Sequence, residues 1–494
     1  MKTTHRHTPT PGAVFRPVTR LRAGILGLFV WGLLLASTRL ALAQNPPAGE
    51  LRTAAQVRSL TPAQAGEGRP VRLKGVVTFF DQELYSRFLQ DETAGIYFQE
   101  LTNMPALKAG QIIELEGVTS PGEFAPIIVP NSVKVVGDGN LPAAKPVSVE
   151  QLVSGQEDSQ LVEVSGIVRS VRFEEESQYH LLDLVMGGER FTAYARQLPT
   201  TQIEELVDST VKVRGVCSTL FNRQRQLFGF RLLLARTADV VIEKPASGNP
   251  FAIPAQSIGS LLQFTPQGSF GHRVKVTGTV AYHEPGSAVF IQDEKEGLYC
   301  QTRQRTPLKA GDRVEVLGFP AKGEYTPVLQ DAIYRRVGDG TAPAAAALEL
   351  DEVLAGTHDC RLVQISAKLL ERTQRGREQF LVLEKGGFIF HAFLAQDGGD
   401  VGFAPLQNGS DVSVAGVCLI ERGSSWRAGE GWRAKSFRLL LRSPGDVVVQ
   451  KTPPVWMQWG ILRIVGFLVV IILAALLWIS ILHRRLAAQR AQKV

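Results

Sequence analysis

The segment Phe-x-Gln-Asp-Glu-x-x-Gly-x-Tyr occurs twice in this 494-residue chain and is its most conspicuous cluster of polar side chains. Asp91 with Glu92, and Asp293 with Glu294, could supply oxygen ligands to a cation, but a metal-binding loop needs more carboxylates at fixed spacing. We therefore expect each copy to be a solvated turn between two strands, with a glycine suited to positive φ. The residues of this structural repeat motif are Asp91, Gly95, Tyr97, Asp293, Gly297 and Tyr299.

Two further segments, 221–228 and 421–433, interleave aromatic rings with arginine at equivalent places in the chain. Flat rings and guanidinium groups suit a planar, sugar or anionic ligand. In a small barrel the loop before the last strand lies at the binding rim. Packing against a neighbouring domain or the membrane interface is the alternative. The candidate ligand-binding residues are Trp426, Arg427, Trp432, Arg433, Phe221, Arg223, Arg225 and Phe228.

Other familiar chemistry has no support between residues 44 and 453. This region contains no GxSxG, HExxH, Walker A or GxGxxG pattern, and its five histidines lack ligand spacing. The four cysteines include no CxxC pair, which argues against a thiolate zinc site. Cys217 and Cys418 occupy equivalent strands and should be buried, whereas a disulfide between Cys300 and Cys360 stays open. We expect no enzyme activity, no metal and no cofactor.

The elements that position these residues come from an internal duplication. Residues 71–77 (VRLKGVV) match 274–280 (VKVTGTV), and the repeat motif, Leu-Lys-Ala-Gly and Gly-Asp-Gly recur at an offset of about 200 residues. The match continues through Phe-Arg-Leu-Leu-Leu, at 230–234 and 437–441, where six extra residues have entered the second copy. The chain therefore holds two copies of one unit.

Each copy divides again into two related domains of about five short strands. The expected boundaries are 44–145, 146–246, 247–346 and 347–453, and short helices are expected at 54–60, 149–153, 255–262 and 350–354. Five strands in this length predict an OB-like barrel, whereas a β-sandwich would need about seven. The expected fold class is mainly β, with four tandem OB-like five-stranded barrels in two pairs.

Charge identifies the two ends of the chain. Of 54 Lys and Arg, six lie in residues 1–43 and five in 454–494, leaving 43 against all 47 Asp and Glu between them. Residues 1–43 therefore predict a basic signal peptide, and 456–483 a transmembrane helix, followed by a cytoplasmic tail at 484–494. A net acidic, exported body argues against nucleic acid as a partner.

The export signal, the tandem OB-like repeats, the closing Phe-Arg-Leu-Leu-Leu with Asp446-Val-Val-Val, and a Trp-flanked span with a basic end form one layout. This layout resembles the extracytoplasmic input region of bacterial membrane sensor histidine kinases, over essentially all of residues 44–494. In that family the span continues into a kinase or diguanylate cyclase core. Only 484–494 follow the span here, so no catalytic residue is carried over, and a partner or a missing C-terminal part would have to supply such a core.

The sequence thus favours a sensor or binding module of a two-component system, single-pass in the inner membrane with its repeats in the periplasm. Its expected partners are an unknown extracytoplasmic ligand and a protein partner or second copy. A structural envelope scaffold that holds exported proteins at the membrane is the alternative.

Overall fold

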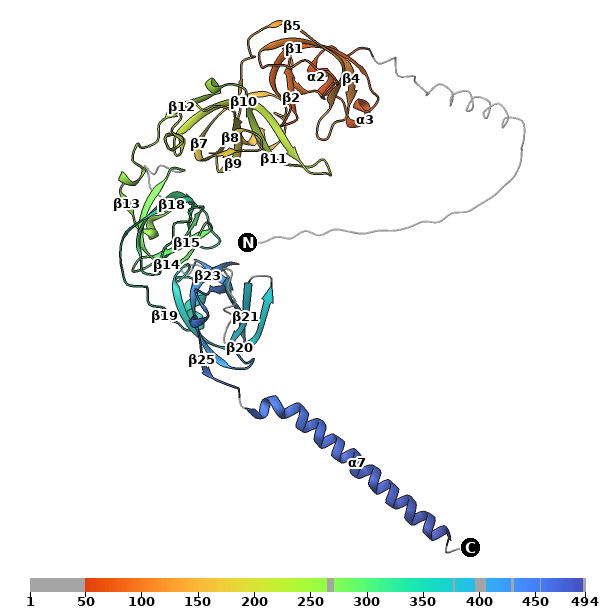
Figure 1. Cartoon of the computed structure of the whole chain (residues 1–494), viewed down its shortest axis with the longest axis vertical. Coiled ribbons are helices and arrows are strands. Elements are labelled where there is room, and N and C mark those ends of the chain that lie inside the picture. Colours follow the sequence, from red (N-terminus) through yellow and green to blue (C-terminus); the bar gives the residue numbers. More distant parts are fainter. Residues whose placement is uncertain are drawn as a thin grey trace, which may run out of the picture.

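The computed structural model describes residues 49–263, 271–375, 378–395, 406–427, 431–453 and 455–491. They form four β-sheets, which follow one another along a curved body, and a long helix that extends from its end (Figure 1). The chain is mainly β, as predicted. The signal peptide expected at residues 1–43 lies outside the described residues.

Sheet 1 is built from five strands, and the loops between them form part of the candidate site. Two short helices precede it, α2 (Ala54–Arg58) and α3 (Pro62–Ala65), each begun by a threonine that accepts a hydrogen bond from the third helical residue. The strands are β1 (Pro70–Asp81), β2 (Ser86–Gln90), β3 (Gly95–Tyr97), β4 (Gln111–Ser120) and β5 (Ile127–Asp138).

Sheet 2 has seven strands, and the helices α4 (Val149–Val153), α5 (Ile203–Leu206) and η1 (Thr237–Asp239) lie between them in the chain. Its strands are β6 (Lys145–Pro146), β7 (Leu161–Glu174), β8 (Tyr179–Met186), β9 (Glu189–Ala195), β10 (Thr210–Phe221), β11 (Leu227–Leu234) and β12 (Val240–Lys244).

Sheets 3 and 4 repeat this arrangement. Sheet 3 follows η2 (Pro250–Ala252), includes η3 (Ile258–Ser260), and contains β13 (Ala255–Gln256), β14 (Val274–Glu284), β15 (Ala288–Gln292), β16 (Gly297–Thr302), β17 (Arg313–Ala321) and β18 (Val328–Gly338). Sheet 4 includes α6 (Leu350–Leu354) and η4 (Pro444–Asp446), and contains β19 (Ala346–Ala347), β20 (Leu362–Arg375), β21 (Glu378–Lys385), β22 (Phe388–Ala395), β23 (Asp411–Arg427), β24 (Gly431–Leu440) and β25 (Val447–Lys451).

The same five-strand order underlies all four sheets. The first three main strands pair in sequence, the third neighbours the fifth, and the fourth pairs back onto the first, as in OB-like folds. Ladders join β7 to β10, β14 to β17 and β20 to β23, while in sheet 1 an isolated bridge between Phe98 and Ile128 joins the third strand to the fifth. Alternating burial along the strands gives each sheet its own apolar core.

One predicted helix is wrong. The segment 255–262 forms the short strand β13 and the single 3₁₀ turn η3 instead of an α-helix. Gly259 lies in this turn, and a Cβ there would come within 2.6 Å of the Glu296 side chain. The other three helices form where they were expected, although α2 ends at Arg58.

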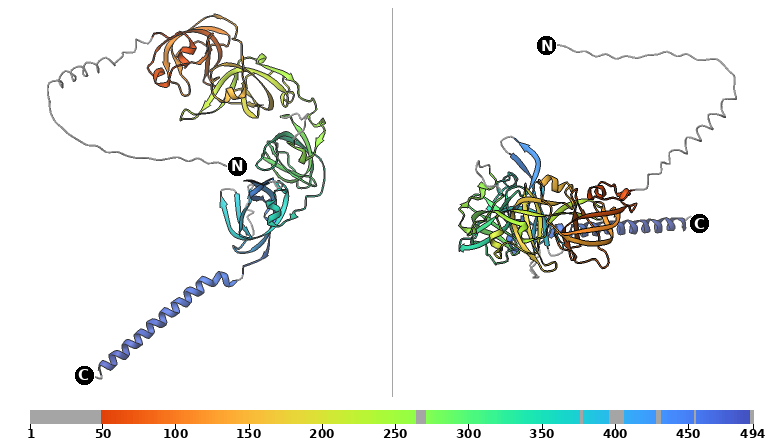
Figure 2. Two further views of the ribbon diagram at one scale, coloured as in Figure 1. Left: turned by 180° about the vertical axis from the view of Figure 1, so that it is seen from behind. Right: turned by 90° about the horizontal axis from the view of Figure 1, so that it is seen from above.

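Apolar clusters join sheet 1 to sheet 2 and sheet 3 to sheet 4. The first combines Phe79 and Phe88 with buried residues of sheet 2, and the second combines Phe290 with Leu362 and Leu440 of sheet 4. Figure 2 shows the same succession of sheets from behind. We call sheets 1 and 2 the first pair and sheets 3 and 4 the second pair.

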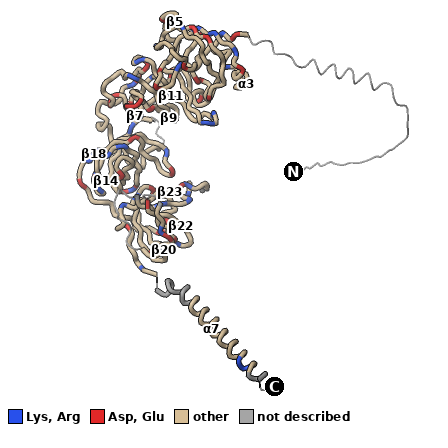
Figure 3. Tube along the Cα trace, turned by 45° about the vertical axis from the view of Figure 1, so that its right-hand side comes forward, with Lys and Arg blue, Asp and Glu red and all other residues tan. Residues whose placement is uncertain are grey.

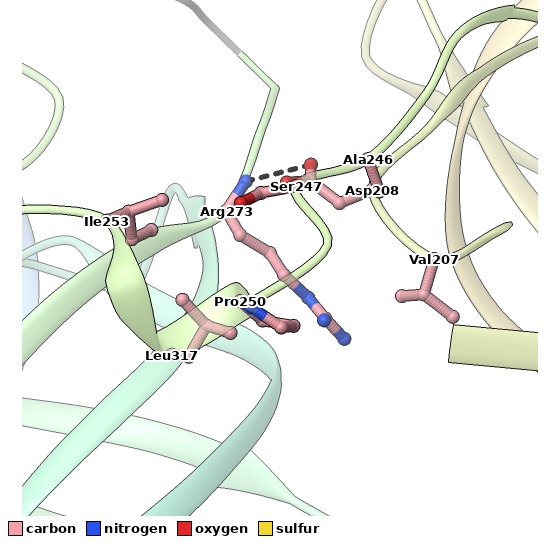
Figure 4. Close-up of a pocket in the computed structure, with 8 residues that line it drawn as sticks. All are labelled: Val207, Asp208, Ala246, Ser247, Pro250, Ile253, Arg273 and Leu317. Carbon is pink, nitrogen blue, oxygen red and sulfur yellow. Dashed lines mark hydrogen bonds between the residues drawn. The ribbon is translucent and has the colours of Figure 1, made fainter. Parts of the chain in front are cut away.

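The junction between the two pairs is polar by comparison. Asp208, in the loop between α5 and β10 of sheet 2, accepts a 3.0 Å hydrogen bond from the Arg273 amide (Figure 4). It also accepts a 3.0 Å bond from the His272 ring. Arg169 and Arg273 both lie within cation–π distance of the Phe319 ring, and burial lowers the pKa of Arg169 to about 10. A small cavity of about 10 Å³ beside Arg273 is no larger than a water site.

The last helix, α7 (Val455–Ala491), contains one segment, Ile464–Ala487, that is long and apolar enough to cross a membrane. Arg484 and Arg485 form the basic stretch near its end (Figure 3). The four cysteines are all buried and free, so Cys300 and Cys360 do not form a disulfide. Burial raises the pKa of the Cys300 thiol, which keeps this thiol protonated and unreactive.

Candidate ligand cleft between the first two sheets

The repeat motif forms a hairpin turn, as predicted. In sheet 1 it joins β2 to β3, and the Asp91 carboxylate accepts hydrogen bonds from the amides of Thr93 and Ala94. The same carboxylate also accepts a 2.7 Å bond from the Ala54 amide at the start of α2. In sheet 3, Asp293 accepts from two amides of its own turn. The motif aspartates therefore stabilise the turn.

The motif glycines have a different role from the one expected. Neither Gly95 nor Gly297 has a positive φ. Instead, a Cβ on Gly95 would lie 2.0 Å from the Ser159 carbonyl oxygen, and a Cβ on Gly297 would lie 2.3 Å from that of Cys360. Each glycine allows the backbone of the neighbouring sheet to approach closely.

The motif glutamines complete the same contact. The side-chain oxygen of Gln90 accepts a 3.0 Å bond from the Leu161 amide, and that of Gln292 accepts a 3.1 Å bond from the Leu362 amide. These amides belong to the neighbouring sheet and are satisfied by the bond. The repeat motif is therefore the surface on which the two sheets of each pair dock.

A cleft of about 580 Å³ opens beside this docking surface in the first pair. Sheet 1 lines it with strands β2 and β3, with the β1–β2 loop and with the β4–β5 loop, and sheet 2 lines it with β10 and β11. Six aromatic rings line the cleft, those of Tyr85, Phe88, Tyr97, Phe124, Phe221 and Phe228.

Two of these rings are largely uncovered, one on each side. Tyr85 of the β1–β2 loop is 72% exposed and Phe228 of β11 is 70% exposed. Across the cleft, the Phe124 and Phe221 rings are nearly parallel, with centroids 6.3 Å apart. Tyr97 donates a 3.1 Å hydrogen bond to the Tyr85 carbonyl and so fixes the loop that carries the exposed Tyr85 ring.

The β10–β11 hairpin is tied directly to sheet 1. The Arg225 guanidinium donates to the carbonyl oxygens of Glu123 at 3.1 Å and Pro121 at 2.9 Å. Because both carbonyls belong to the β4–β5 loop, Arg225 connects the two sides of the cleft. Its role here is to position the cleft wall.

A buried polar cluster fixes the base of the β1–β2 loop. Asp81 of β1 accepts hydrogen bonds from the Tyr179 hydroxyl at 2.8 Å, from Arg196 at 2.5 Å and from the Leu84 amide at 2.8 Å. Burial opposes ionisation of Asp81, but these bonds outweigh it and hold the pKa of its carboxyl below the usual range. Burial also raises the pKa of Tyr179, which therefore stays protonated as a donor.

The charged groups on the cleft surface are few. The Arg231 guanidinium lies over the Tyr194 ring, 5.1 Å from its centroid, and contacts the Ser86 hydroxyl at 3.4 Å. Asp158 is buried and accepts from the Thr219 hydroxyl at 2.8 Å, whereas Glu123 is exposed. The described lining thus has one arginine and two carboxylates.

The second pair has different residues at the positions that line the cleft in the first pair. Strand registers place Leu419 and Ile420 where the first pair has Ser218 and Thr219. The same registers, which include a bulge in both hairpins, place two basic residues where Phe221 and Phe228 lie, namely Arg422 and Lys435. There the loop and hairpin meet through the Tyr325 hydroxyl, which donates a 2.9 Å bond to the Trp432 carbonyl.

The predicted ligand-binding residues are thus divided between two places. Phe221 and Phe228 line the cleft, Arg225 joins its walls, and Arg223 is exposed on the same hairpin outside the lining. In sheet 4, Trp432 is 49% exposed beneath the Arg422 guanidinium, and Arg433 is also exposed. Trp426 and Arg427 pair across the hairpin with Trp432 and Gly431, but their side chains lie outside the described residues.

Sequence reasoning missed the half of the cleft that sheet 1 contributes. Tyr85 and Phe124 lie in loops, and no sequence pattern predicted a binding role for either residue. Their convergence with Phe221 depends on how two sheets dock. The repeated glycine and glutamine were the available signal for that docking.

The comparisons with known proteins leave the family open. No family model and no curated protein matches this chain. Among solved structures, a murine DNA-binding protein bound to double-stranded DNA is 8% identical and covers 36% of this chain and 98% of its own, at a TM-score of 0.21. A p204 HINb domain is 11% identical, covering 37% and 100%, at 0.20. A replication protein A heterotrimer bound to single-stranded DNA is 8% identical, covering 62% and 96%, at 0.18. Likenesses this weak carry no inference about what this chain binds.

Proposed function

We propose that this protein is a membrane-anchored binding module that acts as the extracytoplasmic input of a bacterial signalling system. Its body consists of four OB-type barrels in two copies of one pair. The first pair binds the ligand in the cleft between its sheets, and the second pair connects this site to the membrane helix. The ring-like strand order of each sheet and the matched docking contacts of both pairs support this division.

The proposed topology follows from the two ends of the chain. Residues 1–43 act as a signal peptide, α7 crosses the inner membrane, and the C-terminus lies in the cytoplasm while the repeats lie in the periplasm. The apolar segment Ile464–Ala487 supports the span. Arg484 and Arg485 support this orientation, because basic residues are enriched on the cytoplasmic side.

One observation carries the binding role, which is the set of uncovered rings around a cleft of about 580 Å³. Ligand sites in proteins have volumes of about 300–1,000 Å³ and combine apolar walls with a few polar groups. A ligand in this cleft would touch both sheets of the first pair, so its binding could change how they sit on one another. The signal would then pass through α7 to a second copy or to another membrane protein.

The test is a thermal-shift screen of the full chain in detergent micelles against neutral sugars, nucleotides, peptides and metal ions. We expect at least one class to raise the melting temperature of the wild type and not that of Phe228→Ala. As a control, Phe173→Ala removes another exposed ring, 48% uncovered on β7 outside the cleft, and should keep the shift.

The competing function is a structural scaffold in the envelope. It would be favoured if no compound shifts the wild type, or if every shift survives in Phe228→Ala. The apolar clusters within each pair fit a rigid stalk, but uncovered rings around a cleft are not needed for one.

A further inference from the structure

The cleft occupies a particular face of sheet 1. Its lining includes β2 and β3 and the loops that connect β1 to β2 and β4 to β5. OB-like folds bind oligonucleotides or oligosaccharides on this face. If the cleft binds a ligand as proposed above, its side chains should favour one of these two classes.

The charges of the cleft disfavour a polyanion. Proteins that bind single-stranded nucleic acid line the groove with Lys and Arg along the backbone path. Here the described lining has Arg231 as its one cation and Glu123 as its one exposed carboxylate, while the buried Asp158 is paired with Arg58 at 3.6 Å. Of the two arginines on the β10–β11 hairpin, Arg225 already donates to two backbone carbonyls and Arg223 lies outside the described lining. A phosphate chain would therefore find one arginine and one exposed carboxylate in the described lining, without the row of cations that it needs.

The rings of the cleft suit a ligand with flat apolar faces. Tyr85 and Phe228 are each about 70% uncovered, one on each side of the cleft. A pyranose ring has an apolar C–H face that can cover such a side chain and a rim of hydroxyls that stays hydrated. Burying these aromatic surfaces would be favourable.

The polar groups of the cleft suit hydroxyl ligands. The exposed carboxylate of Glu123 can only accept hydrogen bonds, and sugar hydroxyls can donate them. The side-chain amide of Gln99 and the hydroxyl of Ser218 also line the cleft and can both donate and accept. Few polar groups among apolar walls give orientation without requiring a charged ligand.

An extended peptide fits less well. Such a peptide usually adds a strand to an exposed sheet edge. Near the cleft, the bridge between Phe98 and Ile128 joins the ends of β3 and β5. The backbone amide of Gln99 also donates a 2.9 Å hydrogen bond to the Ile128 carbonyl. The nearest edge of sheet 1 is thereby occupied by its own chain.

We infer that the cleft of the first pair binds a neutral oligosaccharide. The second pair, with Leu419, Ile420, Arg422 and Lys435 at the matching positions, does not bind it. The inference rests on the proposed function and adds the chemical class of the ligand and the sheet pair that holds it.

Isothermal titration of the full chain in detergent micelles tests the inference, with cellotetraose, maltotetraose and chitotetraose as probes. Oligothymidylate and tetra-alanine provide the other two classes. We expect at least one tetrasaccharide to bind and neither other probe to do so. Phe228→Lys gives the first pair the residue of the second and should weaken binding at least tenfold. The reverse change, Lys435→Phe, should leave affinity unchanged.

The outcomes separate the two claims. Binding of oligothymidylate or tetra-alanine that Phe228→Lys abolishes would overturn the sugar inference and keep the cleft as a ligand site. Sugar binding that Phe228→Lys and Tyr85→Ala both leave intact would place the sugar elsewhere and overturn the inference. If no probe binds and the compound screen also yields no shift, both proposals fail.

Discussion

The two sheet pairs share their docking contacts but differ in the surface beside them. In both pairs a glycine without a side chain and a glutamine that caps an amide bring the neighbouring sheet close, at Gly95 with Gln90 and at Gly297 with Gln292. The cleft-facing hairpin, by contrast, exposes phenylalanine in the first pair and carries basic residues in the second. Residues common to both copies therefore report architecture, and the residues that differ are the ones to examine for binding.

The largest effect should follow from breaking the shared contact. Gly95→Ala places a methyl group 2.0 Å from the Ser159 carbonyl, and Gly297→Ala places one 2.3 Å from the Cys360 carbonyl. Each should destabilise its own pair by about 3 kcal/mol, at the upper end of the usual cost of overpacking. Scanning calorimetry of the full chain in micelles would measure the loss.

Gly137→Ala is the matched control for these variants, because a Cβ at Gly137 on β5 meets no atom within 4 Å. The free energy of unfolding of Gly137→Ala should stay within about 0.5 kcal/mol of the wild-type value, as for most surface changes. An equally stable Gly95→Ala protein would show that the two sheets do not dock as described.

A smaller effect should separate the pairs. Asp81→Asn weakens the hydrogen bonds that Asp81 accepts from Tyr179 and Arg196. This cluster is specific to the first pair, because the strand registers place Glu378 in sheet 4 where sheet 2 has Tyr179, and Ala395 where it has Arg196. The expected loss is about 1–3 kcal/mol, the range for leaving a buried partner unsatisfied. The corresponding change in sheet 3, Glu284→Gln, should cost less than about 0.5 kcal/mol.

The same cluster gives a pH dependence of known sign. Because the folded pKa of Asp81 lies below its ordinary value, its contribution is present above about pH 4 and is lost as the pH falls through the folded pKa. The free energy of unfolding should be measured at pH 7 and at pH 3. The difference in this free energy between wild type and Asp81→Asn should be smaller at pH 3. A difference that grows on acidification would contradict the assignment.

The junction between the pairs should show the smallest effect. Arg190 of sheet 2 forms an ion pair with Asp331 of sheet 3, and Arg190 is about 40% exposed, so the pair is screened by water and salt. Arg190→Ala should cost at most about 1 kcal/mol, and less at 1 M NaCl. A loss as large as that of Asp81→Asn, unchanged by salt, would mean that this junction is as firmly fixed as the contacts within each pair.

Much of this architecture could be predicted from the sequence because it depends on local patterns. Alternating apolar residues, turn residues and the duplication predicted a mainly β chain, and the long apolar run predicted the helix that contains Ile464–Ala487. The role of Gly95 could not be predicted, since it depends on the approach of Ser159, which is distant in sequence. Phe221 and Phe228 could be named in advance because they belong to one local pattern of aromatic residues and arginines. Tyr85 and Phe124 could not, because they reach the cleft only through the docking of two sheets.

The most direct test of the central claim is hydrogen–deuterium exchange of the full chain in nanodiscs, with and without the tetrasaccharide that binds most tightly. The account predicts slower exchange at 84–88, 121–127 and 218–228 in the first pair, and no change at the matching segments of the second pair, which are 285–290, 322–328, 419–427 and 431–435. Equal protection of both pairs, or protection confined to the second, would contradict the claim that the first pair holds the ligand.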